Sequence, residues 1–483
     1  MSKADEKDIE KEALNESSTG FDRSLWRNIY VLSITMGMMI LFFGWNSFLN
    51  LYIRDLGASA FEIGIFVAVT TSAHAMSCII FARISDRKGR KPFVIVGTFL
   101  TGVAYASFIL FNSWVLLMIP VFIQQLLHAA YVNPMQAMMS ESIPSDKRAT
   151  ASGLFQTIGG GFNFLAPLLA AFLMVYFAGP VPEHLRVITS LPYLFLISGA
   201  VMMTVTAIRW LMLRETYNPS SQSTNNPEKS AKGNPKVLGD LGGDHRPERS
   251  LGFRSKPILG LYGFIILASL ILASINAFMA IYFNEELGFT DVQIAIWASV
   301  AIGVNALAQI PGGRIADKYS KKNVLLISVV FYLVGIILFI RASNLIEVLL
   351  AQIPFSVGNA FRFNTEFAMI ASFSPSDRRS TGYALQTAIF DIAFMPGPLI
   401  GGFLYGISPL LPFTFILILS APTLLFGILF LRNPEPAFKG TATKEISPKL
   451  FLCPQCSLEI EIIGQFCPAC GVDLEIAQKE EQA

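Results

Sequence analysis

Four cysteines in two close pairs are the residues of this sequence most clearly spaced for chemistry. Cys453 and Cys456 belong to "CPQC", and Cys467 and Cys470 belong to "CPAC". Thiolates at this spacing can wrap one tetrahedral zinc ion, and four protein ligands leave no open position for catalysis. We therefore expect a small structural zinc ribbon over residues 451–475, folded largely by metal binding. A redox dithiol is the alternative, which the doubled pair disfavours.

A second group of candidates consists of ionisable residues in apolar surroundings. In "NAFRFNTEFAM", Arg362 and Glu366 stand four residues apart, on one face of a helix. Ionisable groups within a bilayer are costly and usually functional. We expect Glu366 to take up and release a proton while Arg362 tunes it or binds an anionic substrate; a neutralised structural pair is the alternative. Asp391, in "TAIFDIAFM", is a further candidate for proton coupling.

The elements that must position these residues are apolar segments. The chain has 483 residues, of which 53% are hydrophobic and only 14% charged. Apolar runs of about 20 residues predict membrane-spanning helices, because backbone polar groups must be satisfied within the segment. We expect twelve spans, at residues 28–53, 61–83, 92–111, 114–140, 149–178, 190–213, 257–284, 291–315, 323–341, 345–372, 380–407 and 410–432.

Two basic phrases reveal a duplication. "ARISDRKGRK" and "GGRIADKYSKK" contain Asp86 and Asp317, which lie 231 residues apart, and "DLG" and "ELG" recur at the same offset. The sequence thus predicts an all-α polytopic membrane protein of two pseudo-symmetric six-helix halves. The predicted parts are a segment at 1–25, halves at 26–213 and 257–432, linkers at 214–256 and 433–450, and the ribbon.

Polar residues inside the predicted spans recur between the halves. These asparagines are Asn46, Asn133, Asn276 and Asn364. They are expected to line a central cavity or to form hydrogen bonds between helices. His74 and His128 also lie within spans, where packing or hydrogen bonding is favoured over a coupling role.

Charge predicts the orientation and excludes other classes of protein. All but four of the 36 Lys and Arg fall on the side of the N-terminus, which predicts cytoplasmic termini in the plasma membrane. The N-terminus has no signal-peptide pattern. A net charge of +2 gives no footprint for nucleic acid. No nucleophile–base motif or phosphate-binding loop indicates an enzyme.

The basic phrases resemble the loop signature of the major facilitator superfamily, over roughly residues 26–432. The matching residues are Asp86, Arg87, Gly89, Arg90 and Lys91 in the first copy, and Gly313, Asp317 and Lys318 in the second. Ala82 and Ser320 stand where the signature has glycine. The resemblance implies that these loops form a latch, with acids such as Glu141 as partners, that opens when the halves rock. The alternative is that these charges only fix the topology.

The resemblance implies a secondary transporter of a small organic solute that works by alternating access. We expect proton-coupled efflux of drugs or metabolites. Ala166, Ala170 and Ala171 replace glycines of the exporters' motif in the fifth span, which weakens that direction. The alternatives are uptake of an organic anion, or a membrane receptor or scaffold that signals through the ribbon to a cytoplasmic protein.

Overall fold

The computed structural model describes residues 23–142, 148–215, 256–373, 379–433, 450–452 and 459–461. The chain divides into two compact units, residues 1–433 and 434–483. The first unit contains every described helix, and the second contains a two-stranded hairpin.

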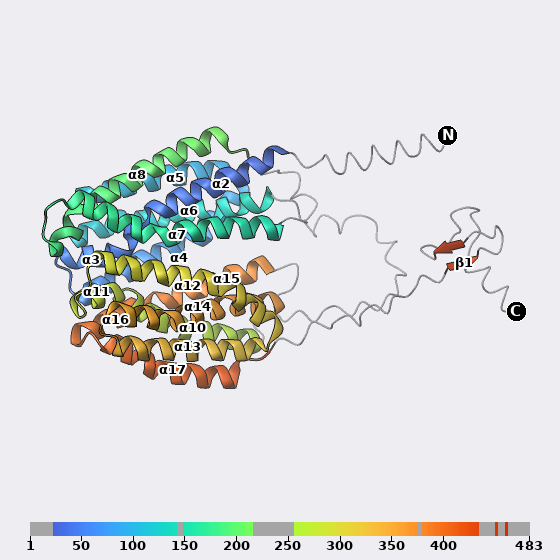
Figure 1. Ribbon diagram of the computed structural model, residues 1–483. Helices are drawn as coiled ribbons and strands as arrows, with labels where there is room; N and C mark the ends of the chain where they lie inside the picture. Colours follow the sequence, from blue (N-terminus) through green and yellow to red (C-terminus); the bar gives the residue numbers. More distant parts are fainter. Residues whose placement is uncertain are drawn as a thin grey trace. The chain divides into compact units, whose positions relative to one another are not determined.

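The first unit consists of an amino half and a carboxyl half (Figure 1). The amino half contains α2 (Arg23–Phe42), η1 (Gly44–Phe48), α3 (Leu49–Asp55), α4 (Ala60–Lys88), α5 (Lys91–Ser107), η2 (Phe108–Leu110), α6 (Trp114–Glu141), α7 (Arg148–Ala178), η3 (Glu183–Leu185) and α8 (Arg186–Met212). The carboxyl half contains α10 (Lys256–Asn276), α11 (Met279–Glu285), α12 (Asp291–Lys318), α13 (Lys321–Arg341), α14 (Leu345–Phe373), α15 (Arg379–Phe394), α16 (Pro396–Ile407) and α17 (Leu411–Phe430).

The two halves begin their helices at equivalent positions. Ser59 and Thr290, 231 residues apart, each form a capping box at the start of α4 and α12. In such a box the side chains of the cap and of the third helical residue satisfy backbone N–H groups that the helix leaves free. Gly57 and Gly288 precede these caps with φ of 90° and 64°, a conformation that glycine adopts without strain. The same local chemistry therefore starts the same helix twice.

Three of the twelve predicted spans are broken in the structure. The first divides into α2, η1 and α3, the seventh into α10 and α11, and the eleventh into α15 and α16. Pro396 begins α16, where a missing N–H costs little. Eleven described segments are long and apolar enough to cross a membrane. The tenth span, α14, is not among them, since Gln352, Asn359, Arg362 and Glu366 make it more polar.

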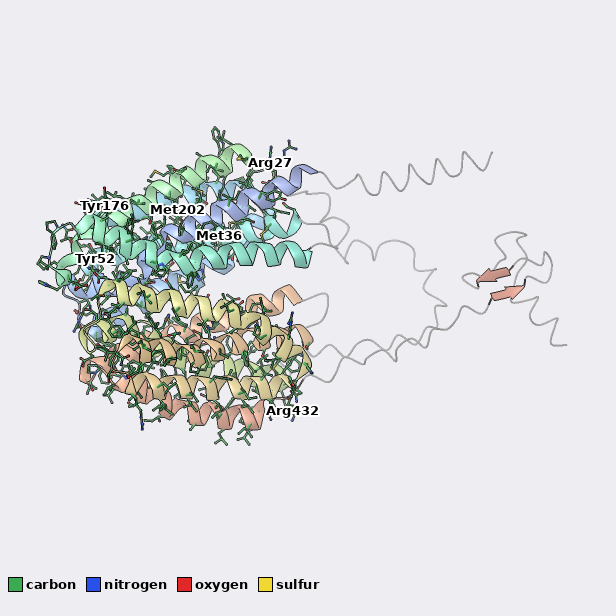
Figure 2. All side chains as sticks on the ribbon, in the orientation of Figure 1. Arg27, Met36, Tyr52, Tyr176, Met202 and Arg432 are labelled. Atoms are coloured by element: carbon green, nitrogen blue, oxygen red, sulfur yellow. The ribbon has the colours of Figure 1, made fainter. Side chains whose placement is uncertain are left out.

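The hydrophobic core shows where the halves meet. Arg27 and Arg432 mark one end of the bundle, here called the termini end, and Tyr52 and Tyr176 mark the opposite, far end (Figure 2). One continuous core cluster contains residues of both halves and is centred on aromatic side chains near the far end. Two further clusters belong to one half each, around Leu32 and around Leu261, in helices near the termini end. The halves thus share a core near the far end and have separate cores near the termini end.

The second unit contains strands β1 (Leu450–Leu452) and β2 (Glu459–Glu461), which pair antiparallel with Phe451 opposite Ile460. The four cysteines of the predicted zinc ribbon lie outside the described residues. The ribbon therefore remains a prediction from the sequence.

Candidate functional site

A cavity of about 190 Å³ lies between the two halves and is lined by residues of both. Its polar lining consists of Asn46, Asn50, Thr70, Thr71, Gln124, Gln125 and Asn276. Its apolar lining includes Phe43, Trp45, Phe66, Phe108 and Phe394. No charged side chain lines it among the described residues. The cavity therefore offers amides that can both donate and accept hydrogen bonds, beside aromatic surface.

Broken helices place the amides at this cavity. Asn46 lies in η1, between α2 and α3, and Asn276 is the last residue of α10 before the break to α11. A Cβ on Gly44, at the first break, would collide with the main-chain oxygen of Ala166 on α7. Only glycine permits this approach, which packs the broken helix against its neighbour. Interrupted helices near the centre of a repeat protein are typical of transporter binding sites.

Ion pairs between the halves close the far end. Arg54 Nε lies 2.7 Å from Glu285 Oε1, and the two residues occupy equivalent positions of the repeat, 231 apart. Glu285 also accepts a hydrogen bond from the Tyr405 hydroxyl at 3.1 Å. Asn50 Nδ2 donates to the carbonyl oxygen of Ala277 across the same boundary at 2.9 Å. The contacts of Arg54 with Glu285 and of Asn50 with Ala277 join the two halves, and Asn50 and Ala277 also line the cavity.

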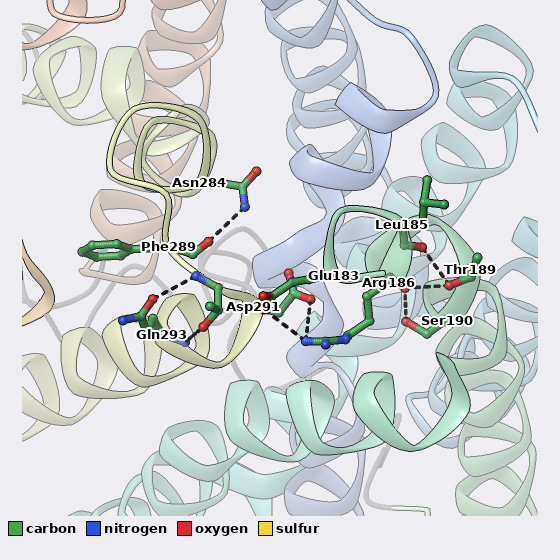
Figure 3. Close-up of polar contacts among 10 residues, drawn as sticks. Glu183, Leu185, Arg186, Thr189, Ser190, Asn284, Phe289, Asp291 and Gln293 are labelled. Carbon is green, nitrogen blue, oxygen red and sulfur yellow. Dashed lines mark hydrogen bonds and ion pairs between the residues drawn. The ribbon is translucent and has the colours of Figure 1, made fainter. Parts of the chain in front are cut away.

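A second ion pair joins α8 to α12 (Figure 3). Arg186 Nη1 lies 3.5 Å from Asp291 Oδ2 and 3.2 Å from Glu183 Oε1. The side chain of Asp291 is 3% exposed and that of Arg186 is 19% exposed, so water screens this contact only in part. The capping pair of Thr290 and Gln293 holds the start of α12, and therefore holds Asp291 in place.

Small residues bring the backbones of the two halves into direct contact. Gly64 on α4 approaches the main-chain oxygen of Pro398 on α16, and Gly402 approaches that of Ala60. Small residues at helix interfaces permit such close packing within a membrane. These two glycines therefore allow α4 and α16 to pack backbone to backbone across the boundary between the halves.

The Arg362–Glu366 pair lies inside the carboxyl half. Arg362 Nη1 donates to Glu366 Oε1 at 2.9 Å, and Arg362 Nε contacts the Tyr332 hydroxyl at 3.2 Å. Both side chains are 2% exposed. Arg362 also lies over the ring of Phe390, 5.7 Å from its centroid. Neither residue lines the cavity.

Asp391, the other predicted coupling residue, lies at the boundary between the halves. Its Oδ2 is 3.6 Å from Nδ1 of His74 on α4. The ring of His74 in turn lies 5.5 Å from that of His128, measured between centroids. The structure therefore brings together three ionisable residues that the sequence offered separately.

Of the four predicted asparagines, two line the cavity. Asn46 and Asn276 do so, whereas Asn364 Nδ2 donates to the carbonyl oxygen of Gln309 at 2.8 Å and links α14 to α12. Asn133 lies on α6 and is not part of the cavity lining. The two interpretations of these amides thus each apply to different members of the set.

The predicted latch loops are described in part. Gly89 has a φ of 94°, and the backbone N–H groups of Arg90 and Lys91 donate to the carboxylate of Glu215 at 3.1 and 3.0 Å. A carboxylate there satisfies free N–H groups and the positive end of the α5 dipole. Asn433 caps α13 in the same way, through the N–H of Lys322 at 3.0 Å.

The remaining latch residues add little geometry. The side chains of Asp86, Arg87, Glu141 and Asp317 lie outside the described residues. Gly313 has open space around it. Lys318 is exposed and lies 5.7 Å from the centroid of the Tyr319 ring.

One buried charge outside the cavity, Arg209, is not predicted from the sequence. Arg209 is fully buried in α8, where it donates to the hydroxyls of Thr35 at 3.0 Å and Thr98 at 2.8 Å. It stands near the end of the apolar run that predicts the sixth span, where a basic residue is typical of the cytoplasmic end of a span. The partnership of Arg54 with Glu285 had a signal in the sequence, since opposite charges occupy equivalent positions of the repeat.

Comparison with known proteins decides the family. The family model described as "Major Facilitator Superfamily" matches residues 31–290 and 261–458. The chain belongs to the major facilitator superfamily. It is therefore a multi-pass membrane protein of a family of secondary transporters, not of enzymes. The prediction from the basic phrases and the duplication is confirmed at this level.

Individual relatives are distant. An "uncharacterized MFS-type transporter" of Methanocaldococcus jannaschii is 24% identical over 431 residues, covering 84% of this chain and 96% of that protein. The quinolone resistance protein NorA of Staphylococcus aureus is 24% identical over 208 residues. That alignment covers 41% of this chain and 53% of NorA, so the chain matches about half the length of that relative.

Solved structures confirm the fold. A bacterial homolog of the human lysosomal transporter Spinster, in its inward-facing and unoccupied conformation, has a TM-score of 0.65 at 14% identity, covering 86% of this chain and all of that chain. The nucleoside transporter NupG has a TM-score of 0.62 at 15% identity, covering 83% of this chain and 98% of that chain.

Proposed function

We propose that this member of the superfamily exports a small organic solute through the central cavity, in exchange for protons. The observation that carries the proposal is the cavity between the halves, lined by amides from two equivalent broken helices. A solute held there touches both halves at once, so rocking of the halves exposes it to either side in turn. The partial similarity to a quinolone resistance protein supports efflux as the direction.

The lining favours an uncharged or weakly charged solute with an aromatic part. Asn46, Asn276 and Gln124 offer donors and acceptors, and Trp45 and Phe66 offer ring faces. A permanent anion would find no described cation in the lining. Uptake of an organic anion through Arg362 is therefore the weaker candidate, because Glu366 and Tyr332 already occupy its guanidinium.

The asymmetric distribution of Lys and Arg supports cytoplasmic termini and insertion in the plasma membrane. The conformation described here would then be closed to the outside by the contacts of Arg54 and Arg186. The loops around Gly89 and Lys318 would act as the latch of the opposite conformation. Labelling of single reporter residues near Arg27 and Arg186, applied from each side of the membrane, tests this orientation.

For the second unit we keep the proposal of a structural zinc ribbon. Its support is the donor set of four cysteines in two pairs, which suits one tetrahedral ion. In the sequence, the first pair falls between β1 and β2, and the second pair follows β2. A cytoplasmic protein is the partner that such a tail would bind.

The experiment that tests transport uses the full chain in proteoliposomes that enclose a pH-sensitive dye. A fluorescent quinolone serves as the first probe, followed by a broad panel of neutral and cationic aromatic solutes. We expect the solute to move against its own concentration gradient when protons flow down theirs in the opposite direction. Replacing Asn46 and Asn276 together with alanine should raise the KM, while replacing Asn133, outside the cavity, leaves it unchanged.

The alternative from another class is a receptor or scaffold that has kept the fold. Complete absence of solute or proton movement across the panel, with a folded protein in the membrane, would favour it. Solute movement that does not depend on the proton gradient would instead support transport and refute proton coupling.

A further inference from the structure

A cluster of three ionisable side chains joins the halves about midway along α4. His74 on α4 and Asp391 on α15 face each other, with 3.6 Å between Nδ1 and Oδ2. His128 on α6 lies beside His74, with 5.5 Å between ring centroids. Among the described residues no three such groups are arranged to hold a metal ion. The ligand that this cluster suits is a proton.

The cluster has buried polar atoms that protein groups do not satisfy. Oδ2 of Asp391 is buried and has no hydrogen-bond partner among the described residues, and the same holds for Nδ1 of His128. The side chain of Asp391 is 13% exposed. A buried carboxylate oxygen that accepts no hydrogen bond is costly. A proton on His74 would convert its contact with Asp391 into an ion pair and supply the missing partner.

The duplication provides an internal control for this cluster. The positions equivalent to His74 and His128 are Asn305 and Asn359 in the carboxyl half, and the position equivalent to Asp391 is Gly160 on α7. The packing of α4 against α15 and α16 in one place corresponds to that of α12 against α7 in the other. At these equivalent positions only one of the two copies carries side chains that bind a proton, so packing alone does not require them.

Other titratable side chains lie on the helices packed around the cluster. The helices packed against α15 are α4, α10, α14 and α16, and α4 also packs against α6. Besides the cluster, their described titratable side chains are Glu62, Tyr131, Lys256, Tyr262, Glu347, Arg362, Glu366 and Tyr405. Arg362 comes near through the ring of Phe390, and its charge is neutralised by Glu366 at 2.9 Å. Tyr131 contacts the ring of His128, with 5.3 Å between centroids.

We propose that His74 and Asp391 together bind the coupling proton, and that His128 limits the site to one. This inference rests on the proposed function. The proton bonds to an imidazole nitrogen of His74 and leaves from it to water; no other bond changes. Two imidazolium rings 5.5 Å apart would repel, so only one of the histidines carries charge. Because α4 and α15 belong to different halves, parting them separates the ion pair and releases the proton.

The test compares two measurements on the same proteoliposomes. Exchange of labelled for unlabelled solute, without a pH gradient, reports folding, solute binding and rocking of the halves. Accumulation driven by a pH gradient reports coupling. The variants are His74→Gln, Asp391→Asn and the swapped His74→Asp/Asp391→His. The matched control is Asn305→Gln, at the position equivalent to His74. Glu366→Gln tests the rival coupling site, the buried Arg362–Glu366 pair.

In the wild type we expect the pH gradient to raise accumulation several-fold. In His74→Gln and Asp391→Asn the ratio of solute accumulation with the pH gradient to accumulation without it should fall to about one, while exchange of solute continues. The swapped variant should regain part of the coupling, and Asn305→Gln should keep all of it.

Coupling that persists in both His74→Gln and Asp391→Asn would overturn the proposal. Coupling that is lost only in Glu366→Gln would assign the proton to Glu366 instead. If the single variants also stop exchanging, the swapped variant decides, and its failure to restore coupling counts against the site. A wild type that moves no solute at all would refute the proposed function instead.

Discussion

Adding one methyl group at Gly402 should open the far end of the bundle. Gly402 lies on α16 of the carboxyl half, and a Cβ there would meet the main-chain oxygen of Ala60 on α4 of the amino half. It would also lie 3.1 Å from Cα of Phe61. These are backbone atoms, so no side-chain rotation relieves the overlap. The halves must separate locally for the alanine to fit.

The size of the effect follows from the cost of overpacking. An extra methyl group in a well-packed contact costs about 1–3 kcal/mol. The clash exists only while the far end is closed, so this free energy is the amount by which the equilibrium moves. Gly402→Ala should therefore raise the ratio of far-end-open to far-end-closed molecules by about 5- to 150-fold.

The matched control is Gly406→Ala, one helical turn away on α16, where a Cβ would meet nothing within 4 Å. Both changes remove a helical glycine, so differences between them report the contact between halves. Spin labels on non-natural amino acids at Leu185 and Val292, on opposite halves, give the distance distribution by electron paramagnetic resonance. A wider distance should gain population in Gly402→Ala only. Identical distributions in the two variants would refute the reasoning.

Three further predictions concern charges and metal. Exchanging Arg54 and Glu285 as a pair should preserve the rate of solute transport. Arg54→Ala should weaken closure of the far end by about 0.2–1 kcal/mol, since the ion pair is partly exposed. Slower transport in the exchanged pair than in Arg54→Ala would contradict this. Glu366→Leu should lower stability by about 3–5 kcal/mol, because it leaves Arg362 buried without a carboxylate; thermal unfolding in detergent measures this, and an added Arg362→Met should recover most of it. The full chain should bind about one zinc ion by elemental analysis, lost in Cys453→Ser; a metal-free wild type would end the ribbon proposal.

Sequence reasoning reached the family and part of the cavity because its signals are local. Apolar runs, turn residues and clusters of Lys and Arg can each be recognised within a short stretch of sequence. The offset of 231 residues then matched Asn46 approximately with Asn276, both of which line the cavity. It also identified Gly57 and Gly288 as equivalent positions. Both glycines have a positive φ just before the capping box of their half.

The amino-acid sequence by itself thus determined that the chain spans a membrane as two related halves, since hydropathy and duplication are written along the chain. Only the tertiary structure decided which ionisable groups meet. His74 and Asp391 are 317 positions apart and lie in different halves, so their contact depends on how two rigid bodies dock. The Arg362–Glu366 pair, four residues apart, was visible in the sequence, but its burial inside one half, away from the cavity, was not.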